Sequence, residues 1–214
     1  NPIFFYDNDP DGLCSFLLLQ KYLGKGRGVA IKSFPGLDQT YFHKVEEFNA
    51  DYIFVLDKPI IDKEFIQLAE KKAIPLVHID HHSVEKTSIK YYYNTFYSSG
   101  MNESVAYLCY RVTRRKEDMW LALIGCISDS FLPDFIDDFK EQYPEMIDAS
   151  YKSAMDILYK TQFGKVTQIV SFAMKDTTSN LITMIRFLMK AQGPHDLLEE
   201  TSATKTFLSR FRYI

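Results

Sequence analysis

Short apolar runs alternate with amphipathic segments over the first 130 residues, and this alternation most constrains the fold. Four runs have the length and the near-continuous apolar character of buried strands: 3–6, 29–34, 52–56 and 75–79. The segments between them, notably 12–22, 41–48 and 62–73, have helical periodicity. Apolar strands separated by helices are typical of a parallel sheet that is covered on both faces. The sequence therefore predicts an α/β fold with a parallel sheet of about five strands flanked by helices.

The second half of the chain has a different pattern. Helical periodicity continues through 103–113, 117–128, 134–139, 151–160, 166–174 and 181–191, without a low-complexity tract or a repeat. We therefore expect an α/β core over residues 1–131. Residues 132–214 are expected to form a C-terminal helical annex that is part of the same domain or packed on it.

Composition excludes several classes of protein. Hydrophobic residues make up 46% of the 214, which is too many for an intrinsically disordered chain. A net charge of −3 excludes proteins that coat nucleic acid through bulk positive charge, so a polyanion must be held by a local patch or by metal ions. No apolar stretch reaches the roughly 20 residues of a membrane helix, and the first residues do not resemble a secretory signal. Three cysteines without a C-x-x-C pair argue against structural zinc and disulfides, so we expect a cytoplasmic protein without a membrane partner.

Acidic and imidazole side chains follow three of the predicted strands. They are Asp7, Asp9 and Asp11 after the first strand, Asp57 after the third, and Asp80, His81 and His82 after the fourth. Ligands of parallel α/β sheets collect at the carboxyl ends of the strands. The sequence therefore predicts that these groups converge at one edge of the sheet.

Each group also has a simpler interpretation. The acids of 7–11 suit a divalent cation at a helix start, but they also suit a helix cap on a solvated turn. Asp57 alone is compatible with a loop cap, whereas adjacent His81 and His82 beside an acid favour a metal or phosphate site. Asp129 ends an apolar helix, where the helix dipole disfavours a carboxylate unless a cation compensates it.

The motifs occur in a characteristic order. An Asp-x-Asp-x-Asp-Gly loop precedes a strand-end Asp, an Asp-His-His triplet and a Gly-x-x-x-Asp helix end. This series resembles the DHH phosphoesterase superfamily, and among its branches it most resembles the RecJ-like nucleases, particularly the compact archaeal ones. The resemblance covers residues 3–131, which would then be the catalytic core. It implies two divalent cations, manganese or alternatively magnesium, held by Asp9, Asp11, Asp57, His81 and Asp129.

The resemblance also implies an activity and the role of each side chain. Asp57 would bridge the two ions, His82 would face the scissile phosphate, and Asp80 would orient an imidazole. The expected activity is a two-metal phosphodiesterase, most similar to an exonuclease on single-stranded DNA or RNA. Expected partners are single-stranded nucleic acid or a short oligonucleotide, and a replication or repair complex.

Two departures from the family pattern leave alternatives open. Phe5 stands where several small-molecule branches have a histidine, and Asp7 is predicted to take that place as a metal ligand. No Gly-Gly-Gly-His segment marks the usual C-terminal substrate domain, so the helical annex would substitute for it or the chain is a catalytic core. One alternative is a small-substrate phosphodiesterase acting on nano-RNA or cyclic dinucleotides, and Phe5 argues against a pyrophosphatase. Another is a non-catalytic scaffold in replication or repair.

Candidate substrate contacts are less specific. Arg111 and Arg114 belong to a basic cluster that suits backbone phosphates, although scattered surface cations that balance the acids are the simpler explanation. Ser99 follows the Asp-His-His segment, where the resemblance implies an active-site wall. The tyrosines of 91–93 and 97 suit base stacking or core packing.

Overall fold

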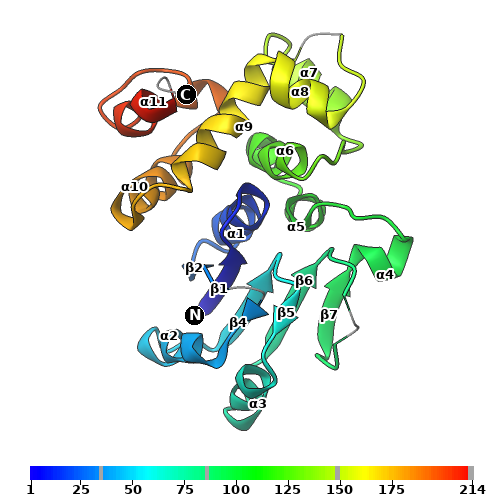
Figure 1. The fold of residues 1–214 in the computed structure, drawn as a ribbon, viewed down its shortest axis with the longest axis vertical. Coiled ribbons are helices and arrows are strands. Elements are labelled where there is room, and N and C mark those ends of the chain that lie inside the picture. Colours follow the sequence, from blue (N-terminus) through cyan, green and yellow to red (C-terminus); the bar gives the residue numbers. More distant parts are fainter. Residues whose placement is uncertain (34–35, 85–86, 148–149, 212–214) are drawn as a thin grey trace.

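The structure is a computed structural model that describes residues 1–33, 36–84, 87–147 and 150–211 (Figure 1). Its main sheet is parallel and has five strands in the order β2-β1-β4-β6-β7. They are β1 (Pro2–Asp7), β2 (Arg27–Ile31), β4 (Tyr52–Leu56), β6 (Leu76–Asp80) and β7 (Tyr91–Asn94). A separate parallel pair joins β3 (Gly36–Leu37) to β5 (Ile60–Ile61). The predicted α/β fold with a five-stranded parallel sheet is confirmed.

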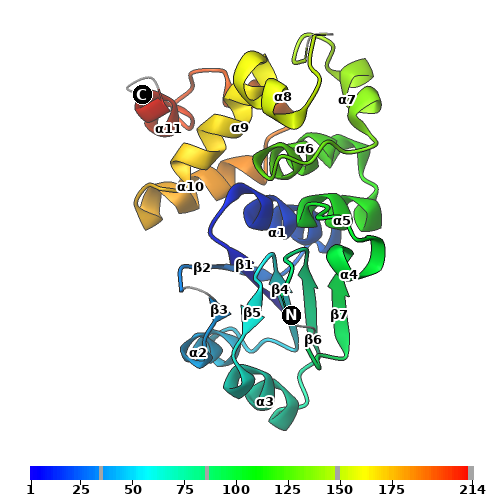
Figure 2. The same ribbon diagram turned by 45° about the vertical axis from the view of Figure 1, so that its right-hand side comes forward.

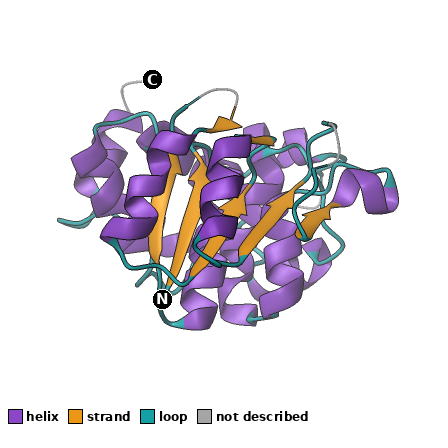
Figure 3. Cartoon of the chain, turned by 90° about the horizontal axis from the view of Figure 1, so that it is seen from below, coloured by secondary structure: helices purple, strands orange, loops and turns teal. Residues whose placement is uncertain are grey.

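Both faces of the sheet are covered because alternate residues of each strand point to opposite sides. In β1, Phe4 and Tyr6 belong to the larger apolar core, whereas Ile3 and Phe5 belong to the smaller one. The larger core includes residues of α1 (Pro10–Leu23), α5 (Val105–Thr113) and α6 (Met119–Ser128). The smaller core includes residues of α2 (Phe42–Glu47) and α3 (Lys63–Lys71), on the other side of the sheet (Figure 2). Figure 3 shows the strands between these two helical layers.

The order of the strands places the functional edge. From β1 the chain goes to the edge strand β2 and then crosses to β4 on the other side of β1. Tyr6 pairs with Leu56, Leu56 pairs with Ile79, and Asp80 pairs with Asn94. The residues that end β1, β4, β6 and β7 therefore lie at one level along the carboxyl edge, where doubly wound sheets bind ligands.

The first helix begins immediately at that edge. Asp9 caps α1 by accepting a hydrogen bond from the Gly12 amide, and Pro10 occupies the first helical turn. A Cβ at Gly12 would lie 2.6 Å from the Asp7 carbonyl oxygen, so only glycine allows the helix to start this close to β1. The helix ends at Gly24, whose φ of 67° closes it in the left-handed conformation.

Several elements differ from the expected ranges. The strand expected over 29–34 is β2 and ends at Ile31, and Phe34 lies outside the described residues. The segment 41–48 is a 3₁₀ turn, η1 (Gln39–Tyr41), followed by α2. The helix expected over 117–128 starts with η2 (Lys116–Asp118) before α6. The β3–β5 pair and α4 (Thr95–Ser99) had no counterpart in the sequence analysis, because two residues or one helical turn give no periodicity.

The C-terminal third is helical. It contains α7 (Ile136–Gln142), α8 (Ala154–Lys160), α9 (Gln162–Ala173), α10 (Thr178–Leu188), η3 (Pro194–Leu197) and α11 (Lys205–Phe211). Phe163 and Val166 of α9 are fully buried in the same apolar cluster as Leu17 of α1 and Trp120 of α6. None of the helices in the described ranges is both long and apolar enough to span a membrane.

Candidate metal centre

Asp57 is the central group of the site. It follows β4 with a φ of 59°, a left-handed conformation that is uncommon for residues other than glycine. This conformation turns the chain sharply at the strand end, and the side chain is only 1% exposed. Neither carboxylate oxygen accepts a hydrogen bond from any described residue. Burying a carboxylate without a hydrogen-bond donor destabilises the fold. A bound cation would compensate its charge.

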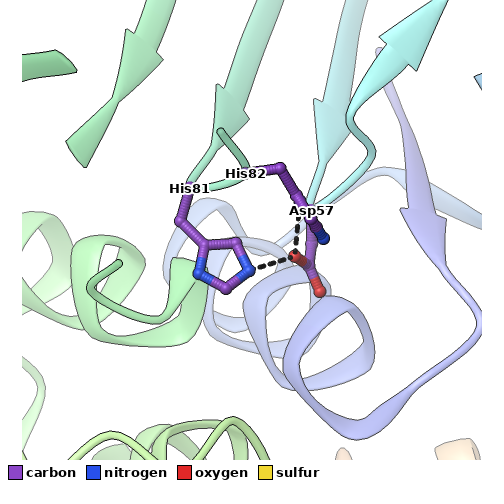
Figure 4. Close-up of side chains that lie close together, drawn as sticks. All are labelled: Asp57, His81 and His82. Atoms are coloured by element: carbon purple, nitrogen blue, oxygen red, sulfur yellow. Dashed lines mark ion pairs between the residues drawn. The ribbon is translucent and has the colours of Figure 1, made fainter. Parts of the chain in front are cut away.

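His81 lies between two of the carboxylates. Its Nε2 is 3.3 Å from Asp57 Oδ1 and 3.2 Å from Asp129 Oδ2. Figure 4 shows the His81 ring and the Asp57 carboxylate pointing toward one another beyond the strand ends. Asp11, Asp57, His81 and Asp129 each offer one ligand atom, and these four atoms lie within 4.8 Å of one another. Asp57, His81 and His82 form a second such group, which shares two members with the first.

Asp11 has a structural partner in addition to this group. Its Oδ1 accepts hydrogen bonds from Ser104 Oγ at 2.7 Å and from the Ala106 amide at 2.8 Å. Its Oδ2 accepts one from the Val105 amide at 2.8 Å. The carboxylate therefore lies at the N-terminus of α5, where the helix dipole favours a negative charge. These bonds fix the orientation of the Asp11 carboxylate.

Gly125 makes room for Asp11. A Cβ at this position of α6 would lie 2.7 Å from Asp11 Oδ1 and 2.5 Å from the Cβ of Ala106. Because α6 has no side chain here, α1, α5 and α6 meet closely beneath the site. The glycine of the Gly-x-x-x-Asp motif is therefore required for packing, while Asp129 at the C-cap of α6 faces His81.

His82 has a different environment from His81. Its Nδ1 lies 2.7 Å from Asp80 Oδ1, and its backbone amide donates to Asp80 Oδ2. Asn94 Nδ2 donates to the His82 carbonyl at 3.0 Å and lies 3.3 Å from Asp80 Oδ2. Asp80 is fully buried, whereas the His82 side chain is 40% exposed. Asp80 and Asn94 thus hold an imidazole whose Nε2 side remains available to a ligand.

Lys58 balances part of the negative charge. Its Nζ is buried and donates to Asp7 Oδ1 at 2.7 Å. The Lys58 carbonyl contacts His78 Nε2 at 2.7 Å, and burial lowers the His78 pKa, so the neutral ring donates this bond. The ring of His78 in turn packs against Tyr92, with the ring centroids 4.8 Å apart. These contacts fix the segment that carries Asp57.

Three carboxylates at the site have raised pKa values: Asp9, Asp57 and Asp129. Burial, and then the negative charge of Asp11, raises the pKa of Asp129 to about 9. Burial and the charges of Asp9 and Asp11 also raise the pKa of Asp57 well above its usual range. The pKa of Asp9 is raised to about 6, first by burial and then by Asp11. A divalent cation would remove this penalty by pairing with the ionised carboxylates.

The two adjacent histidines are shifted in opposite directions. Burial lowers the pKa of His81, which favours the neutral imidazole that a metal ion requires. The hydrogen bond to Asp80 raises the pKa of His82, which favours the imidazolium. Burial acts against ionisation of Asp80, but the interactions with His82 outweigh it and lower the Asp80 pKa. The pair therefore provides one candidate ligand and one candidate proton donor.

The residues present fit divalent metal ions. Three carboxylates and one imidazole whose ligand atoms lie within 4.8 Å of one another suit manganese, and carboxylate oxygens also suit magnesium. Asp57 and His81 belong to both groups. The orphaned oxygens of Asp57 are the strongest sign of a cation.

The remaining predicted site residues lie elsewhere. Within the described part of the chain, Asp7 and Asp9 belong to neither group: Asp7 pairs with Lys58, and Asp9 caps α1. Ser99 is exposed on α4 and donates to the Thr95 carbonyl. Arg111 and Arg114 are exposed toward the far end of α5, roughly 9 and 14 Å of helix away from the Asp11 contact at Val105.

Three residues that shape the site were not identified from the sequence. Ser104 has the position of a helix cap before an apolar run, which is a readable signal. Lys58 directly follows Asp57, and a lysine next to a strand-end acid suggests charge pairing. Asn94 follows a run of tyrosines, and no sequence pattern marks its contact with the Asp-His-His segment.

Residues 3–127 match the family model of the DHH family, N-terminal domain. No curated protein matches the sequence. Among solved structures, the chain is similar to the exonuclease RecJ bound to manganese, with 14% identity and a TM-score of 0.67. It is also similar to RecJ in complex with Mn²⁺ from Thermus thermophilus, with 12% identity and a TM-score of 0.62. An uncharacterized protein from Helicobacter pylori has 11% identity and a TM-score of 0.56.

These similarities establish the fold. In each of the three, 99% of this chain is matched. The chain spans only 60% of the manganese-bound RecJ chain, 34% of the Thermus thermophilus RecJ chain and 61% of the Helicobacter pylori chain.

Proposed function

This chain belongs to the DHH family of phosphoesterases, and we propose that it hydrolyses phosphodiester bonds of single-stranded nucleic acid with two divalent cations. The observation that carries this proposal is the convergence of Asp11, Asp57, His81 and Asp129 at the carboxyl edge of the sheet. Neither oxygen of the buried Asp57 accepts a hydrogen bond from a described residue, which supports a cation there rather than a purely structural cluster.

The ligand roles proposed here follow the group of Asp11, Asp57, His81 and Asp129, and His82 is kept as the proton donor. Asp57 is proposed as the residue shared by the two ions, because it is buried and neither of its oxygens accepts a hydrogen bond from a described residue. Asp129 completes one group and Asp11 contributes to it while it remains bonded to α5. Asp9 and Asp7, which belong to neither group, are proposed as further ligands. Manganese is proposed over magnesium because an imidazole is present.

His82 and Asp80 are proposed to take the roles that the metal ions do not supply. When bound, the ions would supply an activated water and neutralise charge on the phosphate. His82 presents the ring edge opposite to Asp80 and can donate a proton or a hydrogen bond as charge develops on a phosphate oxygen. Asp80 is a positioning residue, since it is fully buried and fixes the His82 ring.

The exonuclease activity and the substrate class are the finer part of the proposal. They are supported by the fold shared with two RecJ structures, one of them described as an exonuclease and both containing manganese. A small-substrate phosphodiesterase for nano-RNA or cyclic dinucleotides would use the same centre. A non-catalytic role in a replication or repair complex would not need the unpartnered Asp57 carboxylate.

The test is hydrolysis of 5′- and 3′-labelled single-stranded DNA and RNA, with a dinucleotide, in manganese and in EDTA. We expect stepwise shortening of the labelled strands in manganese and no shortening in EDTA. The Asp57→Asn variant should not shorten the strands in manganese. Asp51→Asn is the matched control, because Asp51 is exposed at the amino end of the same strand and pairs with the N-terminus.

Each alternative result has a definite meaning. Cleavage of the dinucleotide alone would contradict the exonuclease proposal and support a small-substrate phosphodiesterase. Cleavage that survives Asp57→Asn would contradict the proposed metal centre. Absence of both manganese binding and cleavage would favour the scaffold.

A further inference from the structure

A cavity of about 390 Å³ lies next to the metal centre, between β7, α4 and α5. We call it the tyrosine pocket. Its walls include Tyr92, Tyr93, Asn94, Thr95, Tyr97 and Leu108. No charged side chain is found among the described residues that line it. Its volume is in the range of small-molecule sites, and its lining combines apolar surface with a few polar groups, as ligand pockets do.

Two of the tyrosines are not packed as core residues. Tyr93 is 57% exposed and Tyr97 is 46% exposed, although both line a concave surface. Tyr92 is partly buried, because its ring packs against His78 on the strand side. The rings of Tyr92 and Tyr97 lie 6.5 Å apart at 59°, so they border a wedge rather than contact face to face. Aromatic surface exposed in this way is typical of a binding site.

Asn94 connects the pocket to the metal centre. It lines the pocket, and its Nδ2 also donates to the His82 carbonyl and to the Tyr92 hydroxyl, at 3.0 and 2.7 Å. Asn94 is paired in register with Asp80, the residue that holds the His82 ring. Asn94 therefore belongs both to the wall of the pocket and to the contacts that hold the backbone of His82, the residue that we place beside a phosphate.

We propose that the tyrosine pocket binds a nucleobase of the nucleotide whose phosphate lies at His82. This inference rests on the proposed function and adds a base-binding subsite to it. A phosphate would not be held in a pocket without cations, whereas a neutral planar base can stack on tyrosine and hydrogen-bond to hydroxyl and amide groups. Stacking of this kind tolerates every base, so the pocket would favour a nucleotide over a bare sugar phosphate without strong sequence preference.

The test compares binding of AMP and ribose 5-phosphate by calorimetry in the presence of manganese. The two ligands have the same phosphate, so their difference reports the base alone. We expect AMP to bind about tenfold more tightly, because a stacked base contributes on the order of 5- to 100-fold. Tyr97→Ala and Tyr93→Ala should reduce this ratio toward one, whereas Tyr97→Phe should retain it.

Tyr52→Ala is the matched control. Tyr52 is 50% exposed and lies at the amino end of β4, at the opposite edge of the sheet. The proposal is overturned if AMP and ribose 5-phosphate bind equally, or if the Tyr97→Ala and Tyr93→Ala proteins keep the wild-type ratio. The readout does not require cleavage: a tyrosine-dependent AMP preference without hydrolysis would support the pocket and reject the nuclease. Hydrolysis together with equal binding of AMP and ribose 5-phosphate would support the nuclease and reject the pocket.

Discussion

Among the single residues, Asp57 destabilises the metal-free protein, and this cost accompanies its proposed role as a metal ligand. Its buried carboxylate must either remain ionised without a donor or take up a proton, and both destabilise the native state near neutral pH. Its left-handed backbone conformation suits asparagine, which tolerates positive φ well. Replacing the carboxylate by an amide of the same shape therefore removes the charge without straining the turn.

We predict that Asp57→Asn raises the stability of the metal-free protein and abolishes its stabilisation by manganese. A gain of about 1–2 kcal/mol would raise Tm by roughly 2–8 °C for a chain of this size. Thermal unfolding in EDTA and in manganese measures both effects at pH 8. A variant that is still stabilised by manganese as strongly as the wild type would show that Asp57 is not a ligand.

The raised pKa of Asp129 predicts a pH dependence of stability and of metal binding. Its pKa is raised from 3.8 to about 9, mainly by burial, so the protonated carboxyl contributes stability that is complete below about pH 4. That contribution is lost as the pH rises toward 9. Manganese binds the ionised carboxylate and must displace the proton, so its apparent affinity should rise over the same range.

We therefore predict that the Tm of the protein in EDTA falls from pH 6 to pH 8.5, while the increase in Tm caused by manganese grows. Asp129→Asn should reduce the fall of Tm with pH in EDTA, because the amide does not titrate. Manganese titrations at three pH values provide an independent measure of affinity. An affinity that is constant over this range would contradict proton displacement from the site.

At the scale of elements, the close meeting of α1, α5 and α6 depends on Gly125. We predict that Gly125→Ala destabilises the protein by about 1–3 kcal/mol, the usual cost of overpacking, because the new methyl group would collide with Ala106 and with Asp11 Oδ1. The same displacement of Asp11 should weaken manganese binding. Chemical denaturation and manganese titration measure the two effects.

Gly193→Ala is a suitable control for this prediction. A Cβ at Gly193 would meet the Tyr143 hydroxyl at 3.2 Å, which is the end of a side chain that can move. We expect it to leave manganese affinity unchanged. If Gly125→Ala is as well tolerated as this control, the three helices are not packed as closely as the structure indicates.

The elements also show what can be predicted from the sequence. Apolar runs revealed the sheet, and the acids after them revealed its functional edge, because both signals are local in the chain. The contact of Asp11 with Ser104, more than 90 residues later, depends on how two helices pack, and no local pattern encodes it. The same holds for Asn94, which joins β7 to the end of β6. The family motifs include the acids and histidines that gather at this edge, and their role as metal ligands stays a prediction. No motif indicated that Asp7 pairs with Lys58.

At the scale of the whole molecule, the question is whether the α/β core and the helical annex are separate units. The larger apolar cluster runs without interruption from β1 and α1 through α6 to the helices after residue 132. Phe139, Phe163 and Leu188 of the annex are fully buried in it. Residues 1–131 without the annex would expose this apolar face to water. We propose that residues 132–214 belong to the same cooperative unit as the core.

A single folding unit predicts a single unfolding transition. Trp120 is the one tryptophan of the chain and is fully buried in α6, which contacts both α1 and α9, so its fluorescence reports the boundary between core and annex. Far-ultraviolet circular dichroism reports helices of both parts. We predict that the two signals change together in urea, with one midpoint, since a common core is lost all at once. Two separate midpoints would mean that the annex unfolds independently, and the metal centre on the core would then survive its loss.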